Sequence, residues 1–532
     1  MNDGIQVKNL RKNKLTLFPF FLGLGFLLYA WFSSYPLLIE FAGDVIFNHI
    51  SPFYWLGMSL MLSSLFLLGV FSKSHYLKCA TCIGTVLIIF SLSFFFFSLP
   101  SSDSTYFRGL NEYFMETKNL DPSQSSHLYY QWPAFFLIGD LTTTVSGLNL
   151  INAEFLLYSI LGSLLAITLY VYASRLFKHG GFLAVTTFFI LMFYFLNFQW
   201  VPYTLGFALV LVLFMLETRR KTPSVLVTMM ILFLVISLTH IFVALFFIFY
   251  LFIQSFVTRE KQYKTQFLLT LITYLIVQFS AYWIEFNILN IFRLPSEYSN
   301  IIQYSLDSVI YPIDAVAQNM SRTVTIAVGL VSLVGFILVL IRRKLRSIDK
   351  SLFLAGIFYT VLGSIFFLLG NRAISLFSIP LSLGVSYLFE TKIRTYLKGL
   401  FLILILLFVS VPIHASFNSY IGSFVPFQTK QEYVAENFLL DSYNWTTSSV
   451  VISHSSVEVY LRSRLDTSQT EVKLENDFWF DFPRIKRYDC ILFTIGIVNN
   501  FLLHNYSVEK ILSEEKFNVI YDNGFSQIAI KS

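Results

Sequence analysis

Residues 224–257 have the sequence SVLVTMMILFLVISLTHIFVALFFIFYLFIQSFV, which contains no Asp, Glu, Lys or Arg. Two apolar runs, 224–239 and 241–257, are separated only by His240. A bilayer core about 30 Å thick needs roughly 20 apolar residues per helix, so the two runs predict a transmembrane hairpin. Excess Lys and Arg marks the cytoplasmic ends of spans, which places His240 on the outer side. The flanking basic residues are Arg219, Arg220 and Lys221 before the hairpin, and Arg259, Lys261 and Lys264 after it.

The same pattern extends over most of the chain. Hydrophobic residues make up 56% of the sequence and charged residues 13%, with 60 Phe. Soluble domains are about 45–50% apolar and about 25% charged, so the composition predicts an all-α polytopic membrane protein. The first run follows a basic start and lacks a cleavage site, so we expect it to be an uncleaved span. We expect about 13 spans, at residues 15–33, 52–72, 79–99, 152–173, 182–198, 203–217, 224–239, 241–257, 266–284, 323–341, 351–369, 373–389 and 400–416.

The basic residues indicate the topology. Every second connection between spans is basic, which predicts a cytoplasmic N-terminus and a C-terminus outside. The basic residues that give the chain its net charge of +6 lie between apolar runs, so the charge does not indicate nucleic-acid binding. The remaining basic connections contain Lys73 and Lys78; Arg175 and Lys178; Arg342, Arg343, Lys344 and Arg346; and Lys392, Arg394 and Lys398.

The outer side is expected to carry most of the polar sequence. A transmembrane domain at 1–416 would have interfacial outer loops at 100–151 and 285–322. Residues 417–532 have ordinary soluble composition and predict a small extracytoplasmic α/β domain.

Within that tail, Asn523-Gly524 lies between alternating runs and predicts a β-hairpin. Ser448–Ile452 and Cys490–Thr494 predict strands. Residues 456–465 and 507–516 predict helices.

Several function classes lack their motifs. The sequence contains no P-loop, G-x-G-x-x-G, H-E-x-x-H or G-x-S-x-G, so an ATP-driven pump is not supported. Cys79 and Cys82 form a C-x-x-C without a second Cys or His pair, which favours two small residues in a helix over a metal site. No metal ligands are therefore predicted.

The loop at 100–151 carries two expected interfacial helices. Ser102 or Asp103 can cap a helix that runs to about Lys118, with Arg108 and Glu112 spaced i, i+4. Its apolar face would lie along the outer membrane interface. Trp132-Pro133 then precedes an apolar helix too short to span. The apolar face consists of Tyr106, Phe107, Leu110 and Phe114.

Four motifs in this order resemble the GT-C superfold of membrane glycosyltransferases, of the protein mannosyltransferase and aminoarabinose transferase type. The resemblance covers residues 80–532. The first two spans precede the family's usual acidic loop, so either Asp103 or Asp44 can be the equivalent acidic residue. The motifs are Asp103-Ser-Thr-Tyr-Phe-Arg108, Tyr129-Tyr-Gln-Trp-Pro133, Thr239-His240 and Gly370-Asn-Arg-Ala-Ile-Ser-Leu-Phe-Ser-Ile-Pro380.

The resemblance implies roles for individual residues. Asp103 would be the catalytic base, although a plain helix N-cap is an equal interpretation. Arg372 would bind the lipid phosphate, where the alternative is an Arg that extends to the interface from a helix end. His240 would share the phosphate or the acceptor, or act only as a polar cap. Tyr129 and Trp132 would stack on sugar or lipid, or belong to an aromatic belt at the interface.

Three carboxylates of the same loop, Glu112, Glu116 and Asp140, leave two interpretations open. They form a solvated face, or they line a groove that binds substrate or a divalent cation such as Mg²⁺ or Mn²⁺. No other cofactor is implied.

The function implied is transfer of a sugar from a polyprenyl-phosphate donor to a glycan, lipid or protein acceptor, outside the cell membrane, in cell-envelope glycan biosynthesis. Phe478-Trp-Phe-Asp481 lacks the second Trp and the Gly of the WWDYG motif, so protein N-glycosylation is not assigned. The alternatives are a transporter or flippase, or a polymerase or ligase, of lipid-linked glycans.

Overall fold

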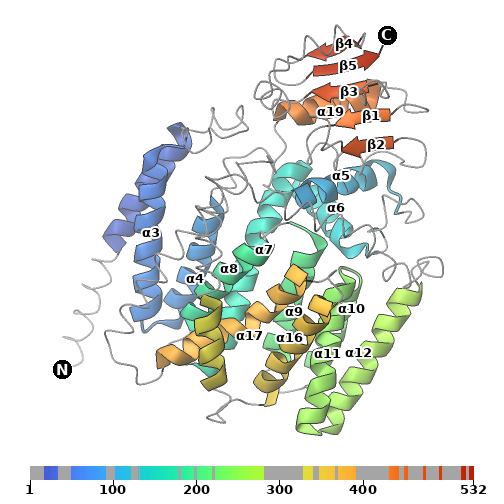
Figure 1. The fold of residues 1–532 in the computed structure, drawn as a ribbon. Coiled ribbons are helices and arrows are strands. Elements are labelled where there is room, and N and C mark those ends of the chain that lie inside the picture. Colours follow the sequence, from blue (N-terminus) through green and yellow to red (C-terminus); the bar gives the residue numbers. More distant parts are fainter. Residues whose placement is uncertain are drawn as a thin grey trace.

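The computed structural model describes most of the helical part of the chain and five short strands. A bundle of long helices carries two shorter helices and a small sheet at one end (Figure 1). The described residues are 17–33, 50–91, 102–120, 130, 132–177, 181–196, 200–217, 222–280, 328–338, 347–365, 370–390, 430–442, 449–452, 471–474, 490–493, 517–522 and 527–531.

The expected spans coincide with helices wherever the chain is described; 400–416 lies outside the described residues. Within these residues, three helices are long and apolar enough to cross a membrane: Pro52–Val70, Leu150–Leu176 and Ile241–Thr258. Shorter apolar helices include Leu17–Ser33 and Val328–Leu338. The bundle helices are α3 (Pro52–Phe71), α4 (His75–Phe90), α7 (Leu150–Leu176), α8 (Gly181–Leu196), α9 (Pro202–Glu217), α10 (Pro223–Ser237), α11 (Ile241–Thr258), α12 (Lys261–Ser280), α16 (Ser347–Ile365) and α17 (Gly370–Glu390).

Rows of large apolar side chains are exposed on the outside of the bundle. On α10, Val227 and Ile231 are exposed one turn apart. On α12, Leu268, Ile272 and Ile276 repeat the same spacing. Residues at i and i+4 share one face of a helix, so these rows are continuous apolar stripes. Water-soluble helices bury such stripes, and helices in a bilayer turn them toward the lipid. The bundle therefore belongs in a membrane.

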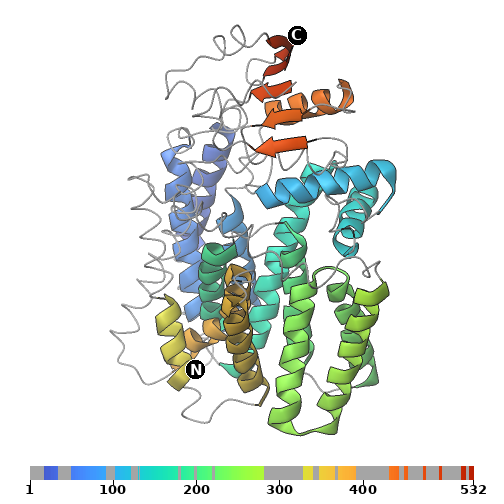
Figure 2. The same ribbon diagram turned by 45° about the vertical axis from the view of Figure 1, so that its right-hand side comes forward.

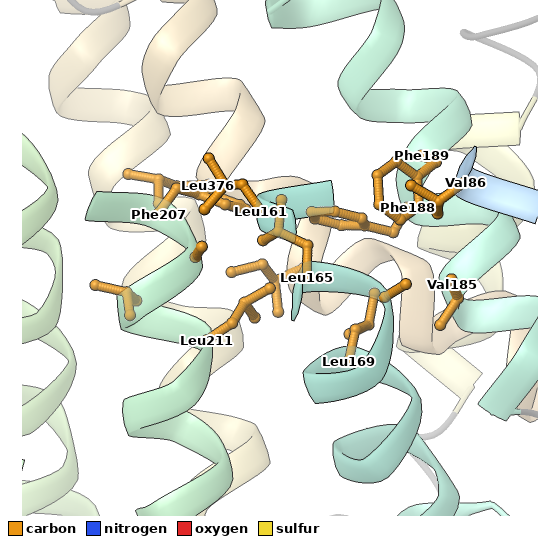
Figure 3. Packing of buried hydrophobic residues seen from close by; sticks show 14 of the residues in the cluster. Val86, Leu161, Leu165, Leu169, Val185, Phe188, Phe189, Phe207, Leu211 and Leu376 are labelled. Atoms are coloured by element: carbon orange, nitrogen blue, oxygen red, sulfur yellow. The ribbon is translucent and has the colours of Figure 1, made fainter. Parts of the chain in front are cut away.

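The centre of the bundle is packed with aliphatic and phenylalanine side chains. Leu161, Leu165 and Leu169 of α7 point from one helix toward α8 and α9, where they approach Phe188 and Leu211 (Figure 3). The i, i+4 spacing of these three leucines puts them on one face of α7. This core holds α7 firmly, and α7 in turn positions the polar residues near its start.

Local sequence signals explain where several bundle helices start. Ser51 caps α3 and is followed by Pro52 at the first helical position. Thr222 caps α10, again with a proline next, and Asn149 caps α7 through the Asn152 backbone N–H. A side-chain acceptor satisfies a free N–H there, and proline has none to lose. Between α10 and α11 the helix breaks at Leu238 to His240, as the sequence predicts.

The sheet has five strands in the order β2-β1-β3-β5-β4. β1 pairs in parallel with β2 and β3, and β5 pairs antiparallel with β3 and β4. The predicted hairpin is confirmed as antiparallel pairing of β4 with β5, in which Asp522 pairs with Gln527. The expected turn at Asn523-Gly524 lies outside the described residues. The two predicted strands are present as β1 and β3, whereas the expected helices at 456–465 and 507–516 lie outside the described residues. The strands are β1 (Ser449–Ile452), β2 (Glu471–Leu474), β3 (Cys490–Phe493), β4 (Phe517–Asp522) and β5 (Gln527–Lys531).

Three further helices lie at the end of the bundle that carries the sheet. These are α5 (Ser102–Thr117), α6 (Ala134–Ser146) and α19 (Lys430–Ser442). In both ribbon views α5 crosses the end of the bundle, with α6 beneath it and the sheet above it (Figures 1 and 2). The helix expected from Ser102 to about Lys118 and the short apolar helix after Trp132-Pro133 are thus confirmed.

Candidate functional site

Helix α5 is buried on its apolar face, as its sequence predicts. Phe107, Leu110 and Phe114 are all buried. The Phe107 ring meets the ring of Phe135 in α6 edge-on, with their centroids 5.6 Å apart. Tyr130 donates a hydrogen bond of 2.6 Å from its hydroxyl to the carbonyl oxygen of Leu110. These contacts fix α5 against α6.

The polar face of α5 is buried too, which a solvated helix would not show. Ser104, Arg108 and Asn111 follow one another at i, i+4 and i+7, so they share one face. All three are buried, and the large Arg108 side chain is only 1% exposed. A guanidinium in such a place is costly unless charged or polar groups surround it. The polar face of α5 is therefore the place to look for a site.

Helix α7 contributes a carboxylate to this place. Glu154, in the second turn of α7, is 1% exposed. It interacts electrostatically with Arg108, which is favourable, and with Glu112, which is not. Its Oε1 atom has no hydrogen-bond partner within the described residues. A buried carboxyl group with an unused hydrogen-bonding atom is typical of a functional site in a membrane protein.

Helix α19 covers the same face of α5. The Tyr433 hydroxyl donates a hydrogen bond to Glu112 Oε1 at 3.1 Å. The Tyr433 ring also lies under the guanidinium of Arg108, with Cζ 5.8 Å from the ring centroid. Burial, followed by the negative charge of Glu112, raises the pKa of the Tyr433 hydroxyl to about 12. Arg108, Glu112, Glu154 and Tyr433 thus form one polar group, here called the α5 cluster.

Two motifs that are far apart in sequence meet beside α6. The Ala134 backbone N–H, directly after Trp132-Pro133, donates a hydrogen bond of 3.0 Å to the carbonyl oxygen of Leu238. His240 follows two residues later, 5% exposed. Its ring meets the Tyr203 ring edge-on, with centroids 5.2 Å apart. The Trp-Pro and Thr-His motifs therefore belong to one region of the bundle.

An aromatic contact links this region to α5. The Phe135 ring, which touches Phe107 of α5, lies 4.7 Å from the ring of Trp200. Trp200 precedes α9, the helix that carries Tyr203. Packed aromatic side chains therefore connect α5 with Trp200, three residues before Tyr203, whose ring contacts His240.

The predicted site residues have different outcomes. Asp103 is in the first turn of α5 and Arg372 is the third residue of α17, but the side chains of both lie outside the described residues, as does all of Tyr129. Trp132 and His240 are described. Trp132 is two residues before Ala134 and His240 is two residues after Leu238, the two residues that the hydrogen bond joins. Glu112 is part of the α5 cluster.

The other two carboxylates lie apart from the cluster. Glu116 is exposed. Asp140 forms an ion pair with Lys118, at 2.9 Å between Oδ1 and Nζ. Among the described side chains, no three His, Cys, Asp or Glu residues come together to hold a metal ion. A divalent cation thus remains a prediction that would need residues beyond these.

Sequence reasoning missed Glu154, Tyr433 and Trp200. Glu154 had a visible signal, because it is the only charged residue in the span expected at 152–173. Tyr433 and Trp200 had none, since nothing in their local sequence indicates which helix they pack against.

Solved structures similar to this chain include two that match it over most of its length. The oligosaccharyltransferase of Archaeoglobus fulgidus, solved in the apo form, is 12% identical with a TM-score of 0.47, over 87% of this chain and 75% of that one. ArnT from Cupriavidus metallidurans, solved with undecaprenyl phosphate, is 8% identical with a TM-score of 0.38, over 86% of this chain and 98% of that one. No protein-family model and no curated protein matches the chain. With TM-scores below 0.5, neither likeness establishes a common fold.

Proposed function

We propose that the chain is a membrane glycosyltransferase that transfers a sugar from a polyprenyl-phosphate donor to a glycan, lipid or protein acceptor. The observation that carries the proposal is the α5 cluster, a buried group of charged residues at the end of an apolar helix bundle. The headgroup of a lipid-linked donor lies at this level of a membrane, and the two short helices α5 and α6 lie across it. Of the sequence motifs that resemble GT-C enzymes, the first is part of α5 and the Tyr-Trp-Pro motif directly precedes α6.

The transfer needs a base and a cation. The acceptor hydroxyl oxygen forms a bond to the anomeric carbon as the bond from that carbon to the phosphate oxygen breaks. In our proposal Asp103 takes the hydroxyl proton, from its position in the first turn of α5. The phosphate leaves with its negative charge, and Arg372 stabilises it through paired N–H donors. His240 and Trp132 contact the substrate from the region beside α6, with Tyr129 in the segment before it.

The proposal also specifies which side of the membrane the candidate site faces. The N-terminus is cytoplasmic and the α5 cluster faces outward, in line with the basic residues between the spans. Residues 417–532 form an extracytoplasmic domain in which α19 covers the donor's headgroup. Polymerisation or ligation of lipid-linked glycans would use the same surface, and a flippase would use the bundle without forming a covalent product.

The test is release of free polyprenyl phosphate by purified protein in lipid nanodiscs, given radiolabelled polyprenyl-phosphate sugars and a mixed glycan acceptor. Wild type is expected to release the lipid and form a labelled product, and Asp103→Asn and Arg372→Ala are expected to lose both. Asp140→Asn is the matched control, because that carboxylate sits in an exposed ion pair with Lys118. Movement of label across liposomes without product would replace the proposal by transport.

A further inference from the structure

The depth of Glu154 in the membrane follows from the length of its helix. Helix α7 has 27 residues, which gives about 40 Å at 1.5 Å per residue. The hydrocarbon core is only about 30 Å thick, so the ends of α7 extend into the headgroup layers. Glu154 lies four residues after the start at Leu150, or about 6 Å along the axis. It therefore lies at the boundary between the headgroup layer and the hydrocarbon core, next to where the sugar of a lipid-linked donor would be.

Two side chains at this level offer unused hydrogen-bonding atoms. Glu154 Oε1 and both amide atoms of Asn111, Oδ1 and Nδ2, are buried without a hydrogen-bond partner within the described residues. An unsatisfied buried polar atom costs about 1–3 kcal/mol, and native proteins keep few of them. Asn111 is on the polar face of α5, three residues from Arg108, and Arg108 interacts electrostatically with Glu154. A ligand that bonds to these atoms would remove the cost.

The chemistry of the two side chains decides which part of the donor fits. Burial favours the neutral form of a carboxyl group, which both donates and accepts hydrogen bonds, as an amide does. Such groups match the hydroxyl groups of a neutral sugar. Arg108 and Glu112 carry opposite charges, so the cluster offers no net positive charge to a phosphate, which needs cations or N–H donors.

We propose that Glu154 and Asn111 bind hydroxyl groups of the transferred sugar and determine which sugar the protein accepts. This inference rests on the proposed function and adds the part of the site that recognises the sugar. The phosphate then binds elsewhere, next to the guanidinium of Arg372.

The experiment measures the affinity of two probes for the protein in nanodiscs: bare polyprenyl phosphate, and polyprenyl-phosphate glucose, mannose or galactose. Glu154→Ala removes the carboxyl group, and Asn111→Ala removes the amide. Each variant is expected to bind the preferred sugar-bearing donor about tenfold more weakly, which is the effect of one lost hydrogen bond to a charged or buried group. Bare polyprenyl phosphate should bind within about twofold of wild type.

The same samples also give the relative affinities for the three sugar-bearing donors. In both variants these three affinities should become more alike. A structural role for Glu154 would weaken both probes alike, and that result overturns the inference. Unchanged binding of the sugar-bearing donor in both variants overturns it as well, while the proposed function stands. If wild type binds neither probe, the proposed function itself fails. Asp140→Asn serves as the control here too.

Discussion

The Tyr433 hydroxyl donates a hydrogen bond to Glu112 Oε1 at 3.1 Å, although the two residues are 321 positions apart in the chain. The bond joins α19, just before the sheet, to α5, the helix that follows the third expected span. Because Glu112 belongs to the same polar group as Arg108 and Glu154, the C-terminal part of the chain contributes directly to the candidate site.

Tyr433→Phe should lower the apparent melting temperature of the purified protein. The variant removes the donor to Glu112 and leaves a half-buried carboxylate short of a partner, a loss of about 1.5–3 kcal/mol for a bond to a charged group. Differential scanning fluorimetry in detergent measures it. Tyr76→Phe is the matched control, because Tyr76 is 91% exposed and should tolerate the change. Equal melting temperatures for the two variants would mean that the α5–α19 bond adds no stability.

The pH dependence of stability should differ between wild type and Tyr433→Phe only at alkaline pH. The pKa of Tyr433 is raised from its usual 10 to about 12 in the folded protein. Between these values the unfolded state has lost the phenol proton and the folded state keeps it, so stability falls as pH rises. Below pH 10 this group has no effect. Melting curves at pH 9 to 12 should therefore fall more steeply for wild type, and parallel curves would contradict the assignment.

Gly139→Ala should destabilise the contact between α5 and α6. A Cβ at Gly139 would lie 2.7 Å from Nδ2 of Asn111 and within 3.1 Å of its Oδ1 and Cγ, so rotating the amide does not relieve the clash. Alanine normally favours a helix by about 1 kcal/mol over glycine, but overpacking costs about 1–3 kcal/mol. Gly25→Ala has no atom within 4 Å of its new Cβ and should be neutral or stabilising. A melting temperature unchanged by Gly139→Ala would show that α5 and α6 pack less tightly.

Tyr172→Phe should cost more stability than Lys118→Ala. The Tyr172 hydroxyl donates a 2.7 Å hydrogen bond to Asp349 Oδ1 between α7 and α16, and both residues are buried. Its loss leaves a buried carboxylate short of a partner, worth about 1.5–3 kcal/mol. The Lys118–Asp140 pair is comparable in length, but the Lys118 side chain is 61% exposed. Exposed pairs contribute about 0–1 kcal/mol. Chemical denaturation in mixed micelles compares them, and equal losses would refute the difference.

The helices and several local features could be predicted because their causes are local. The break at His240 follows from a polar residue between two apolar runs, and α6 follows from Trp132-Pro133 at its start. The hairpin of β4 and β5 could be predicted because the alternating runs on both sides of Asn523-Gly524 are a local signal.

The candidate site could be predicted only in part, because its geometry is not local. From the sequence alone, the polar face of α5 would be predicted to be exposed to water. Only the positions of α7 and α19 show that it is buried. Helix α19 has no apolar run to indicate that Tyr433 would reach Glu112. Glu154 was visible as a lone carboxylate in a span, but its proximity to Arg108 depends on how α5 crosses the end of α7.

The most direct test of the account is to locate a bound donor. A polyprenyl-phosphate sugar with a photoreactive diazirine beside the phosphate would be bound to the protein in nanodiscs, irradiated, and the labelled peptides identified by mass spectrometry. The account predicts labelling in α5, α6 or the turn between α10 and α11, with competition by unlabelled donor. Competed labelling near Tyr172 and Asp349, at the opposite end of α7, would contradict it.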